Sequence, residues 1–217
     1  MTMKKPIVAV LGGTGKEGPG LALRWANAGY QIIIGSRQKE KADITAAELN
    51  LTLGIDTITG MENDAAARAA DISVLTVVQS AQQAALNGLK NALQGKILAD
   101  ATARIDFRDP KPPAPPAAAE IAQEILGEGV RVVAAFQNVP AHALRKLDEP
   151  IDSDVLICSN DVDAAEQVIE LAEAGGMKSF YAGGLVNAVT VEGLTAILIS
   201  LNKFHKVKTA SIGITGI

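Results

Sequence analysis

The feature that most constrains this chain is a glycine-rich turn placed between an apolar run and a helical pattern. Residues 7–11 are all apolar, and Gly-Gly-Thr-Gly-Lys-Glu-Gly follows them at residues 12–18. From Pro19 to Ala28 the apolar side chains recur at helical spacing. The order strand, tight loop and helix is the setting in which spaced glycines predict a dinucleotide-binding loop.

The glycine pattern can be read in two registers. Gly13, Gly15 and Gly18 fit G-x-G-x-x-G. In that pattern the first glycine permits the sharp turn, the second admits a pyrophosphate and the third lets the helix pack on the strand. Gly12, Gly15 and Gly18 also fit G-x-x-G-x-x-G. Both registers predict a dinucleotide, because phosphates would meet the free N–H groups of the helix N-terminus. The alternative is an ordinary glycine-rich strand-to-helix turn.

The end of the second expected strand favours NADP over NAD. An NAD site usually has an acidic residue here for the ribose 2′-hydroxyl, whereas an NADP site has an arginine for the 2′-phosphate. The sequence continues with Ser36 and Arg37, and no carboxylate comes before Glu40. Lys41 follows Arg37 by four residues, so on a helix the two cations would share a face. We therefore expect a 2′-phosphate pocket here, with a solvated basic helix start as the alternative.

Expected strands and helices alternate along most of the chain. The strands are expected at residues 7–11, 31–34, 57–60, 72–78, 97–100, 130–135, 154–158 and 178–181. The helices are expected at residues 19–28, 39–49, 63–70, 82–93, 117–126, 163–173 and 185–204, with Asn63 or Asp64 capping the third. This alternation predicts an α/β protein with a Rossmann-like, doubly wound, mostly parallel sheet and a C-terminal helical part.

The chain changes character near its end. Residues 185–204 form an apolar helical stretch that needs cover on several sides, from an internal hairpin of helices or from a dimer seam. We therefore divide the chain into an NADP-binding Rossmann-like domain at 1–183 and a C-terminal helical segment at 184–217. The proline-rich residues 109–116 are expected to be a stiff surface connection, or a lid bordering the site.

Composition excludes several classes of protein. The net charge of −4 argues against a nucleic-acid groove. The apolar run at 194–201 is too short and interrupted to predict a membrane span, and the start leaves no room for a signal peptide, so we expect a cytoplasmic protein. The single cysteine, Cys158, is expected to be a packing residue. His142 and His205 lack metal-ligand spacing, so we expect no metal, and we expect His142 at the surface.

The chain lacks the proton-donating tyrosine and lysine pair of short-chain dehydrogenases. Tyr-x-x-x-Lys is absent, because Ile34 and Leu185 stand four residues after the two tyrosines. Two explanations remain open. The protein binds the dinucleotide without catalysis, or it passes hydride to an acceptor whose own ring system accommodates the charge. In the second case the protein supplies proximity and orientation.

The whole chain resembles the NADPH:coenzyme F420 oxidoreductases, also called F420-dependent NADP reductases. The resemblance rests on several stretches along the sequence. They are Leu11–Gly15 with Gly20–Arg24, Gly35–Arg37 with Lys41, 71–77, 118–121, 139–141, and Glu192–Thr195 with Ile197 and Leu198. It implies hydride transfer between the nicotinamide of NADP(H) and the deazaflavin F420, and a homodimer formed through the C-terminal part.

The resemblance also implies roles for individual residues. The pyrophosphate would be held by Thr14, Gly15, Lys16 and Glu17, and the 2′-phosphate by Ser36, Arg37 and Lys41. The path to the nicotinamide would be lined by Val77 and Ala141, and the carboxamide would be held by backbone near Ala141 and Ile212. The deazaflavin would stack near Gln137, Asn138, Thr195 and Leu198.

Three features on the acceptor side differ from what the resemblance leads us to expect. Gln137 stands where a histidine is expected, Val78-Gln79 stands where a proline and an aromatic residue are expected, and residues 109–116 are unusually rich in proline. They leave open a reductase of another flavin, a quinone or another small molecule, and also a non-catalytic NADP(H)-sensing protein.

Overall fold

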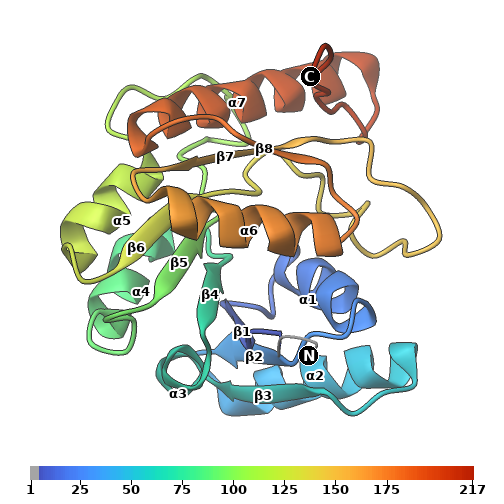
Figure 1. Ribbon diagram of the computed structural model, residues 1–217. Helices are drawn as coiled ribbons and strands as arrows, with labels where there is room; N and C mark the ends of the chain where they lie inside the picture. The colour runs from blue at the N-terminus through green and yellow to red at the C-terminus, as the bar shows by residue number, and fades with distance from the viewer. Residues whose placement is uncertain (1–4) are drawn as a thin grey trace.

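The computed structural model describes residues 5–217, which form an α/β fold around one eight-stranded sheet (Figure 1). The strand order is β3-β2-β1-β4-β5-β6-β7-β8, and all pairs are parallel except β6 with β7. The strands are β1 Val8–Leu11, β2 Ile32–Ser36, β3 Ile58–Glu62, β4 Ile72–Leu75, β5 Ile97–Asp100, β6 Arg131–Ala134, β7 Val155–Ser159 and β8 Ser179–Tyr181. The predicted mostly parallel, doubly wound sheet is confirmed.

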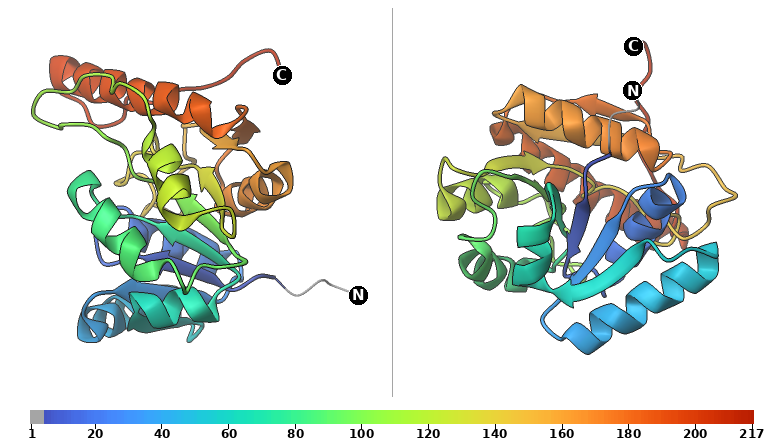
Figure 2. Two further views of the ribbon diagram at one scale, coloured as in Figure 1. Left: turned by 90° about the vertical axis from the view of Figure 1, so that its left-hand side faces the viewer. Right: turned by 60° about the horizontal axis from the view of Figure 1, so that its bottom comes forward.

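Helices cover both faces of the sheet (Figures 1 and 2). They are α1 Gly18–Asn27, α2 Lys39–Leu53, α3 Asn63–Ala69, α4 Gln79–Leu89, α5 Ala118–Leu126, α6 Val162–Ala174 and α7 Ala188–His205, with a 3₁₀ turn at Leu185–Asn187. Alternate residues of β1 belong to two separate hydrophobic cores, one on each face of the sheet. Val8 and Val10 belong to the core that contains Trp25, whereas Ala9 and Leu11 belong to the core that contains Leu86. A strand buried on both faces therefore has no polar side, which explains its uninterrupted apolar sequence.

Several predicted boundaries were wrong by a few residues. The helix predicted to end at residue 49 continues to Leu53 and ends at Gly54, whose φ of +67° only glycine adopts readily. Asn50 is kept in the helix because its side chain both donates to and accepts from the backbone of Ile58. The strand predicted at 72–78 ends at Leu75, and α4 begins at Gln79.

The C-terminal stretch is one helix, so the predicted alternative of an internal helical hairpin is wrong. By length and hydropathy alone, Leu185–His205 would be long enough to cross a membrane, in contrast to the prediction from residues 194–201. One face of α7 is nevertheless buried against the protein, and this face includes the carboxylate of Glu192.

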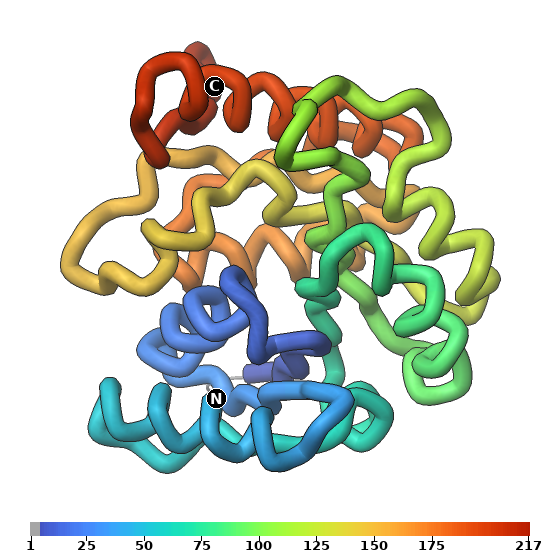
Figure 3. Tube along the Cα trace, turned by 180° about the vertical axis from the view of Figure 1, so that it is seen from behind, coloured from blue at the N-terminus to red at the C-terminus, as the bar shows by residue number. Residues whose placement is uncertain are grey.

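The proline-rich segment lies along α7 (Figure 3). Pro112 lies beside Gly193, where an added Cβ would be 3.4 Å from the proline Cβ. Further along the helix, Lys203 donates from Nζ to the carbonyl oxygen of Arg108 at 2.9 Å. The segment is therefore a connection that packs on the C-terminal helix over much of its length.

Candidate functional site

The loop between β1 and α1 requires three of its four glycines for its own packing. Gly12 has a φ of +70°, and a Cβ on it would lie 2.6 Å from Val77 Cγ1. A Cβ on Gly13 would lie 2.6 Å from the carbonyl oxygen of Val10, and one on Gly18 would lie 2.6 Å from the Cα of Gly13. These contacts fix the sharp turn and bring the helix against the strand.

Gly15 is different, because the protein leaves room for a side chain there. An added Cβ would meet no atom nearer than the carbonyl oxygen of Gly12, at 3.7 Å. Within the described part of the chain, the amides of Thr14, Lys16 and Glu17 donate to no protein acceptor. The loop therefore presents unpaired N–H groups beside an open space at the start of a helix, which is the arrangement that fits a pyrophosphate.

Two residues that sequence reasoning missed hold this loop in place. Asn63 accepts a hydrogen bond from the Gly12 amide through Oδ1 at 3.1 Å. Its predicted role as a helix cap is wrong, because it is the first residue of α3 and Glu62 is the N-cap. Thr76 donates from its backbone amide to the carbonyl oxygen of Leu11 at 2.9 Å. The position of each residue just after a strand was the only signal in the sequence.

Ser36, Arg37 and Lys41 lie near the end of β2. Ser36 is buried, and its hydroxyl accepts from the amide of Gln38 at 3.3 Å. Arg37 precedes α2, which begins at Lys39, so the prediction that Arg37 and Lys41 share a helical face is wrong. Both side chains are exposed, and no ion pair within residues 5–217 involves either of them. Their charges are therefore available to an anion.

The structure brings the four predicted acceptor residues to the carboxyl end of β6 and the adjoining face of α7. Gln137, Asn138, Thr195 and Leu198 are all buried. Thr195 donates from Oγ1 to the Gln137 carbonyl oxygen at 3.1 Å. Gln137 donates from Nε2 to the carbonyl oxygen of Asp100 at 3.1 Å, while its Oε1 is buried and accepts no hydrogen bond from the described residues.

The direction of β7 adds a further residue to this edge. Because β7 is antiparallel to β6 and pairs with it through Cys158 and Ser159, its start extends past the end of β6 to the turn that follows. Asn138 donates from Nδ2 to the carbonyl oxygen of Asp154 at 2.7 Å, and the Asp154 amide donates to Ile212 at 2.9 Å. Asp154 therefore joins two predicted site residues that are far apart in sequence. Ala141 lies after the same turn and is partly buried, and His142 is exposed, as predicted.

Two buried carboxyl groups lie beneath the acceptor edge. Burial raises the pKa of both Asp100 and Glu192 above the ordinary range. Asp100 accepts hydrogen bonds from Gln82 Nε2 at 2.5 Å and from the Thr102 amide at 2.9 Å. Glu192 accepts from the amides of Ala118 and Arg104, at 2.6 and 2.9 Å, so it fixes both ends of the segment that contains the prolines.

Glu17 has no such partners. Its Oε1 is buried without a hydrogen bond to the described residues, and burial raises its pKa to about 8. At neutral pH the side chain is therefore protonated, so it adds no negative charge to a loop that fits phosphates. Cys158 is buried and its pKa is raised to about 11 by burial, in agreement with its predicted packing role.

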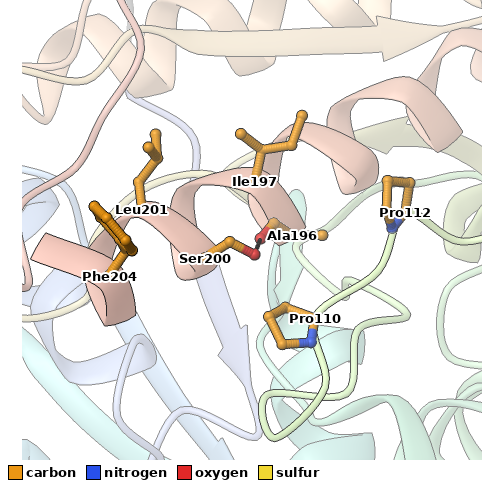
Figure 4. Close-up of a pocket in the computed structure, with 7 residues that line it drawn as sticks. All are labelled: Pro110, Pro112, Ala196, Ile197, Ser200, Leu201 and Phe204. Atoms are coloured by element: carbon orange, nitrogen blue, oxygen red, sulfur yellow. Dashed lines mark hydrogen bonds between the residues drawn. The ribbon is translucent and has the colours of Figure 1, made fainter.

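A groove of about 290 Å³ lies on the outer face of α7 (Figure 4). It is lined by Pro110, Pro112, Ala196, Ile197, Ser200, Leu201 and Phe204. Ile197, Leu201 and Phe204 are exposed, whereas the predicted acceptor residues Thr195 and Leu198 are buried. The groove is therefore separate from the edge that holds Gln137.

Comparison with known proteins identifies the family. Residues 7–104 match the family described as coenzyme F420-dependent NADP oxidoreductase. The F420-dependent NADP reductase of Methanothermobacter thermautotrophicus is 41% identical over 227 residues, which cover 100% of this chain and 97% of that protein. This chain belongs to the F420-dependent NADP reductase family.

A second named reductase and a solved structure are also similar to this chain. The F420-dependent NADP reductase of Methanocaldococcus jannaschii is 40% identical, with 97% of this chain and 98% of that protein covered. A candidate F420-dependent NADP reductase of Arthrobacter sp. FB24 has a similar fold, with a TM-score of 0.79 and 23% identity over 96% of this chain and 99% of that one.

Proposed function

We propose that this protein is an oxidoreductase that transfers hydride between NADP(H) and the deazaflavin coenzyme F420. The observation that carries the proposal is family membership over the full length of the chain, at 41% identity to a named reductase. The open space at Gly15 and the unpaired amides around it support the NADP(H) half. The nicotinamide supplies the hydride chemistry when bound, and the protein supplies position and exclusion of water.

The NADP(H) site of this proposal runs along the carboxyl ends of β1, β2 and β4. The pyrophosphate is assigned to the loop Gly13, Thr14, Gly15, Lys16, Glu17 and Gly18. Ser36, Arg37 and Lys41 are assigned to the 2′-phosphate. This favours NADP(H) over NAD(H), because no carboxylate of residues 5–217 pairs with either of the two cations. The Val77 side chain packs directly against Gly12 of the loop, because a Cβ on Gly12 would lie 2.6 Å from Val77 Cγ1. This contact supports the assignment of Val77 to the dinucleotide site.

The acceptor half is assigned to the edge where β6, β7 and α7 meet. Gln137, Asn138, Thr195 and Leu198 line it, and Ala141 and Ile212 border the nicotinamide. Gln137 Oε1 and Asn138 Oδ1 are buried and accept no hydrogen bond from residues 5–217. They support this assignment, since buried acceptors without partners are costly unless a ligand donates to them. No acid–base pair is needed when the acceptor ring carries the charge.

The remaining parts of the proposal concern organisation. Residues 1–183 bind NADP(H), and residues 184–217 contribute to the acceptor site and to a homodimer. The exposed apolar side chains of Ile197, Leu201 and Phe204 support a subunit contact on α7, because a second copy would remove them from water. The partners are small-molecule coenzymes, without nucleic acid or membrane, and we place the protein in the cytoplasm.

A coupled absorbance assay tests the function. Purified protein is mixed with NADPH and oxidised F420, and the expected result is simultaneous loss of the NADPH and deazaflavin bands. Parallel reactions with free flavin and with a quinone identify a different acceptor. Absence of turnover with F420 at any pH, with NADPH binding intact, would contradict the proposal. Tight binding with no turnover of any acceptor would favour a sensor.

A further inference from the structure

Arg24 on α1 is a buried cation surrounded by backbone carbonyl groups. The side chain is only 7% exposed, and no carboxylate within residues 5–217 forms an ion pair with it. Its guanidinium makes five hydrogen bonds: Nε to Leu144 O (2.9 Å), Nη1 to Gly175 O (3.3 Å), and Nη2 to Ala143 O (3.2 Å), Lys146 O (2.7 Å) and Glu149 O (3.2 Å). Four of the five acceptors lie in one short segment, residues 143–149.

A second contact, also made by α1, sets the distance between this segment and the helix. Gly20 lies one turn before Arg24, and a Cβ on it would be 2.5 Å from Leu144 Cβ. Any larger residue would therefore push the segment away. Glycine at this place and arginine four residues later together hold residues 143–149 directly against α1.

The next residue on α1 supports the other end of the same region. The Trp25 ring packs edge-on against the Phe136 ring, with centroids 5.7 Å apart and an interplanar angle of 66°. Phe136 has a φ of +74°, which is costly for a residue with a large side chain, so the surrounding packing must maintain it. Phe136 immediately precedes Gln137. Both ends of the segment that carries Gln137 and Ala141 are thus supported by α1.

We propose that Arg24 is a positioning residue, which holds the wall of the nicotinamide end of the site through residues 143–149. The inference rests on the proposed function and deepens it. The helix whose first turn fits the pyrophosphate also fixes the segment next to Ala141, so one rigid element sets the distance between the two ends of the dinucleotide site. Arg24 contacts neither substrate and acts through the backbone that it binds.

The chemistry of the side chain explains why arginine is needed. Guanidinium has five N–H donors in one plane and remains charged when buried, whereas the lysine ammonium has three donors. Arg24→Lys therefore keeps the charge but leaves some of the five carbonyl groups without a donor. We therefore expect the variant to loosen residues 143–149 while the charge at this position stays the same.

Binding of two ligands separates a positioning role from general damage. NADPH reaches the nicotinamide end, whereas 2′,5′-ADP occupies only the adenosine end. For Arg24→Lys we expect NADPH affinity to fall about tenfold, the effect of losing about one hydrogen bond's free energy, with 2′,5′-ADP affinity unchanged. We also expect faster trypsin cleavage at Arg145 or Lys146, because both lie in the released segment.

Leu49→Ala is the matched control, since Leu49 is buried on α2 and takes part in none of the five hydrogen bonds of Arg24. It should lower thermal stability but leave the ratio of the two affinities unchanged. If Arg24→Lys lowers stability without changing that ratio or the cleavage rate, Arg24 has only a structural role and the inference is wrong. Equal loss of both ligands would also overturn it.

Turnover is a separate readout, and it distinguishes this inference from the proposed function. In an active enzyme, Arg24→Lys is expected to lower kcat with F420 while KM for F420 changes less. A wild-type protein that binds NADPH but reduces no F420 would refute the proposed acceptor. The NADPH to 2′,5′-ADP ratio and the trypsin cleavage rate would still decide the role of Arg24.

Discussion

Thr195 on α7 donates its hydroxyl hydrogen to the backbone carbonyl oxygen of Gln137, at 3.1 Å. This bond joins the C-terminal helix to the turn after β6, and it links the two parts of the proposed acceptor site directly. It also couples the position of α7 to the orientation of the Gln137 backbone. The same hydroxyl lies 3.2 Å from the Val191 carbonyl oxygen within α7, so its single hydrogen is shared between the two acceptors.

Removal of that bond should affect the acceptor more than NADPH. Thr195→Val keeps the shape of the side chain but removes the donor, at a cost of about 1 kcal/mol for a typical hydrogen bond. We expect KM for F420 to rise roughly fivefold and the Kd of NADPH to stay unchanged. Ser200→Ala, on the same helix, removes a hydroxyl that donates to the Ala196 carbonyl oxygen of the preceding turn and should have no effect on either constant. A rise in both constants for Thr195→Val would show that the acceptor site is misplaced.

Arg37 should determine the preference for the phosphorylated coenzyme. A charge-assisted hydrogen bond is worth about 1.5–3 kcal/mol, so Arg37→Ala should weaken NADP(H) binding by about ten- to a hundredfold and NAD(H) binding far less. Titration of all four nucleotides measures the change. Lys39→Ala is the control, because Lys39 lies between Arg37 and Lys41 in the sequence but forms an ion pair with Asp43 at 2.6 Å. An unchanged NADP/NAD ratio would place the 2′-phosphate elsewhere.

Substitutions of two glycines in the loop between β1 and α1 should have different effects on NADPH binding and on stability. Gly15→Ala fits the open space seen in the protein, so we expect an unchanged melting temperature and weaker NADPH binding, because the methyl group occupies the place of the pyrophosphate. Gly13→Ala should lower the melting temperature, since its Cβ would lie 2.6 Å from the Val10 carbonyl oxygen. Thermal melts with and without NADPH compare both variants. Normal NADPH affinity in folded Gly15→Ala would contradict the assignment.

Glu17 should make stability depend on pH. Burial raises its pKa in the folded protein to about 8 from 4.5, so the unfolded chain releases this proton at lower pH than the folded protein does. The free energy of unfolding should therefore decrease as the pH rises from about 4.5 to about 8, by on the order of a few kcal/mol, since one pKa unit corresponds to about 1.4 kcal/mol. Urea denaturation across this range measures the slope.

Glu17→Gln removes the titrating group and should flatten this part of the profile, with the variant more stable than the wild type near pH 8. Glu166→Gln on α6 is an exposed control that should leave the slope unchanged. Parallel profiles for wild type and Glu17→Gln would mean that Glu17 is ionised in the folded protein.

The sequence predicted the features that depend on local periodicity. Every strand of the sheet was predicted near its place, most of them from apolar runs, and residues 97–100 were predicted with the bounds that β5 has. The predicted end of α2 was wrong because the bonds between Asn50 and Ile58 depend on a strand that comes later in the chain. Local propensity contains no information about such a partner.

The features of the site that could not be predicted from the sequence depend on contacts between segments that are far apart in the chain. The reversed direction of β7, which brings Asp154 to Asn138, has no signature in either strand alone. The role of Asn63 beside Gly12 depends on a pairing across 51 residues. Family resemblance supplied Ile212 as a site residue, whereas the sequence pattern indicated the glycine loop and the cations after β2.

The packing of Trp25 against Phe136 gives the protein an intrinsic optical probe. Trp25 is the only tryptophan in the chain, and it is fully buried. Its ring packs against Phe136, which immediately precedes Gln137, and its Nε1 donates to the Leu171 carbonyl oxygen at 2.8 Å, so its fluorescence emission responds to the packing of that turn and of α6. Rearrangement at the junction of α1 and the acceptor edge can therefore be followed in unlabelled protein, in real time and at low concentration.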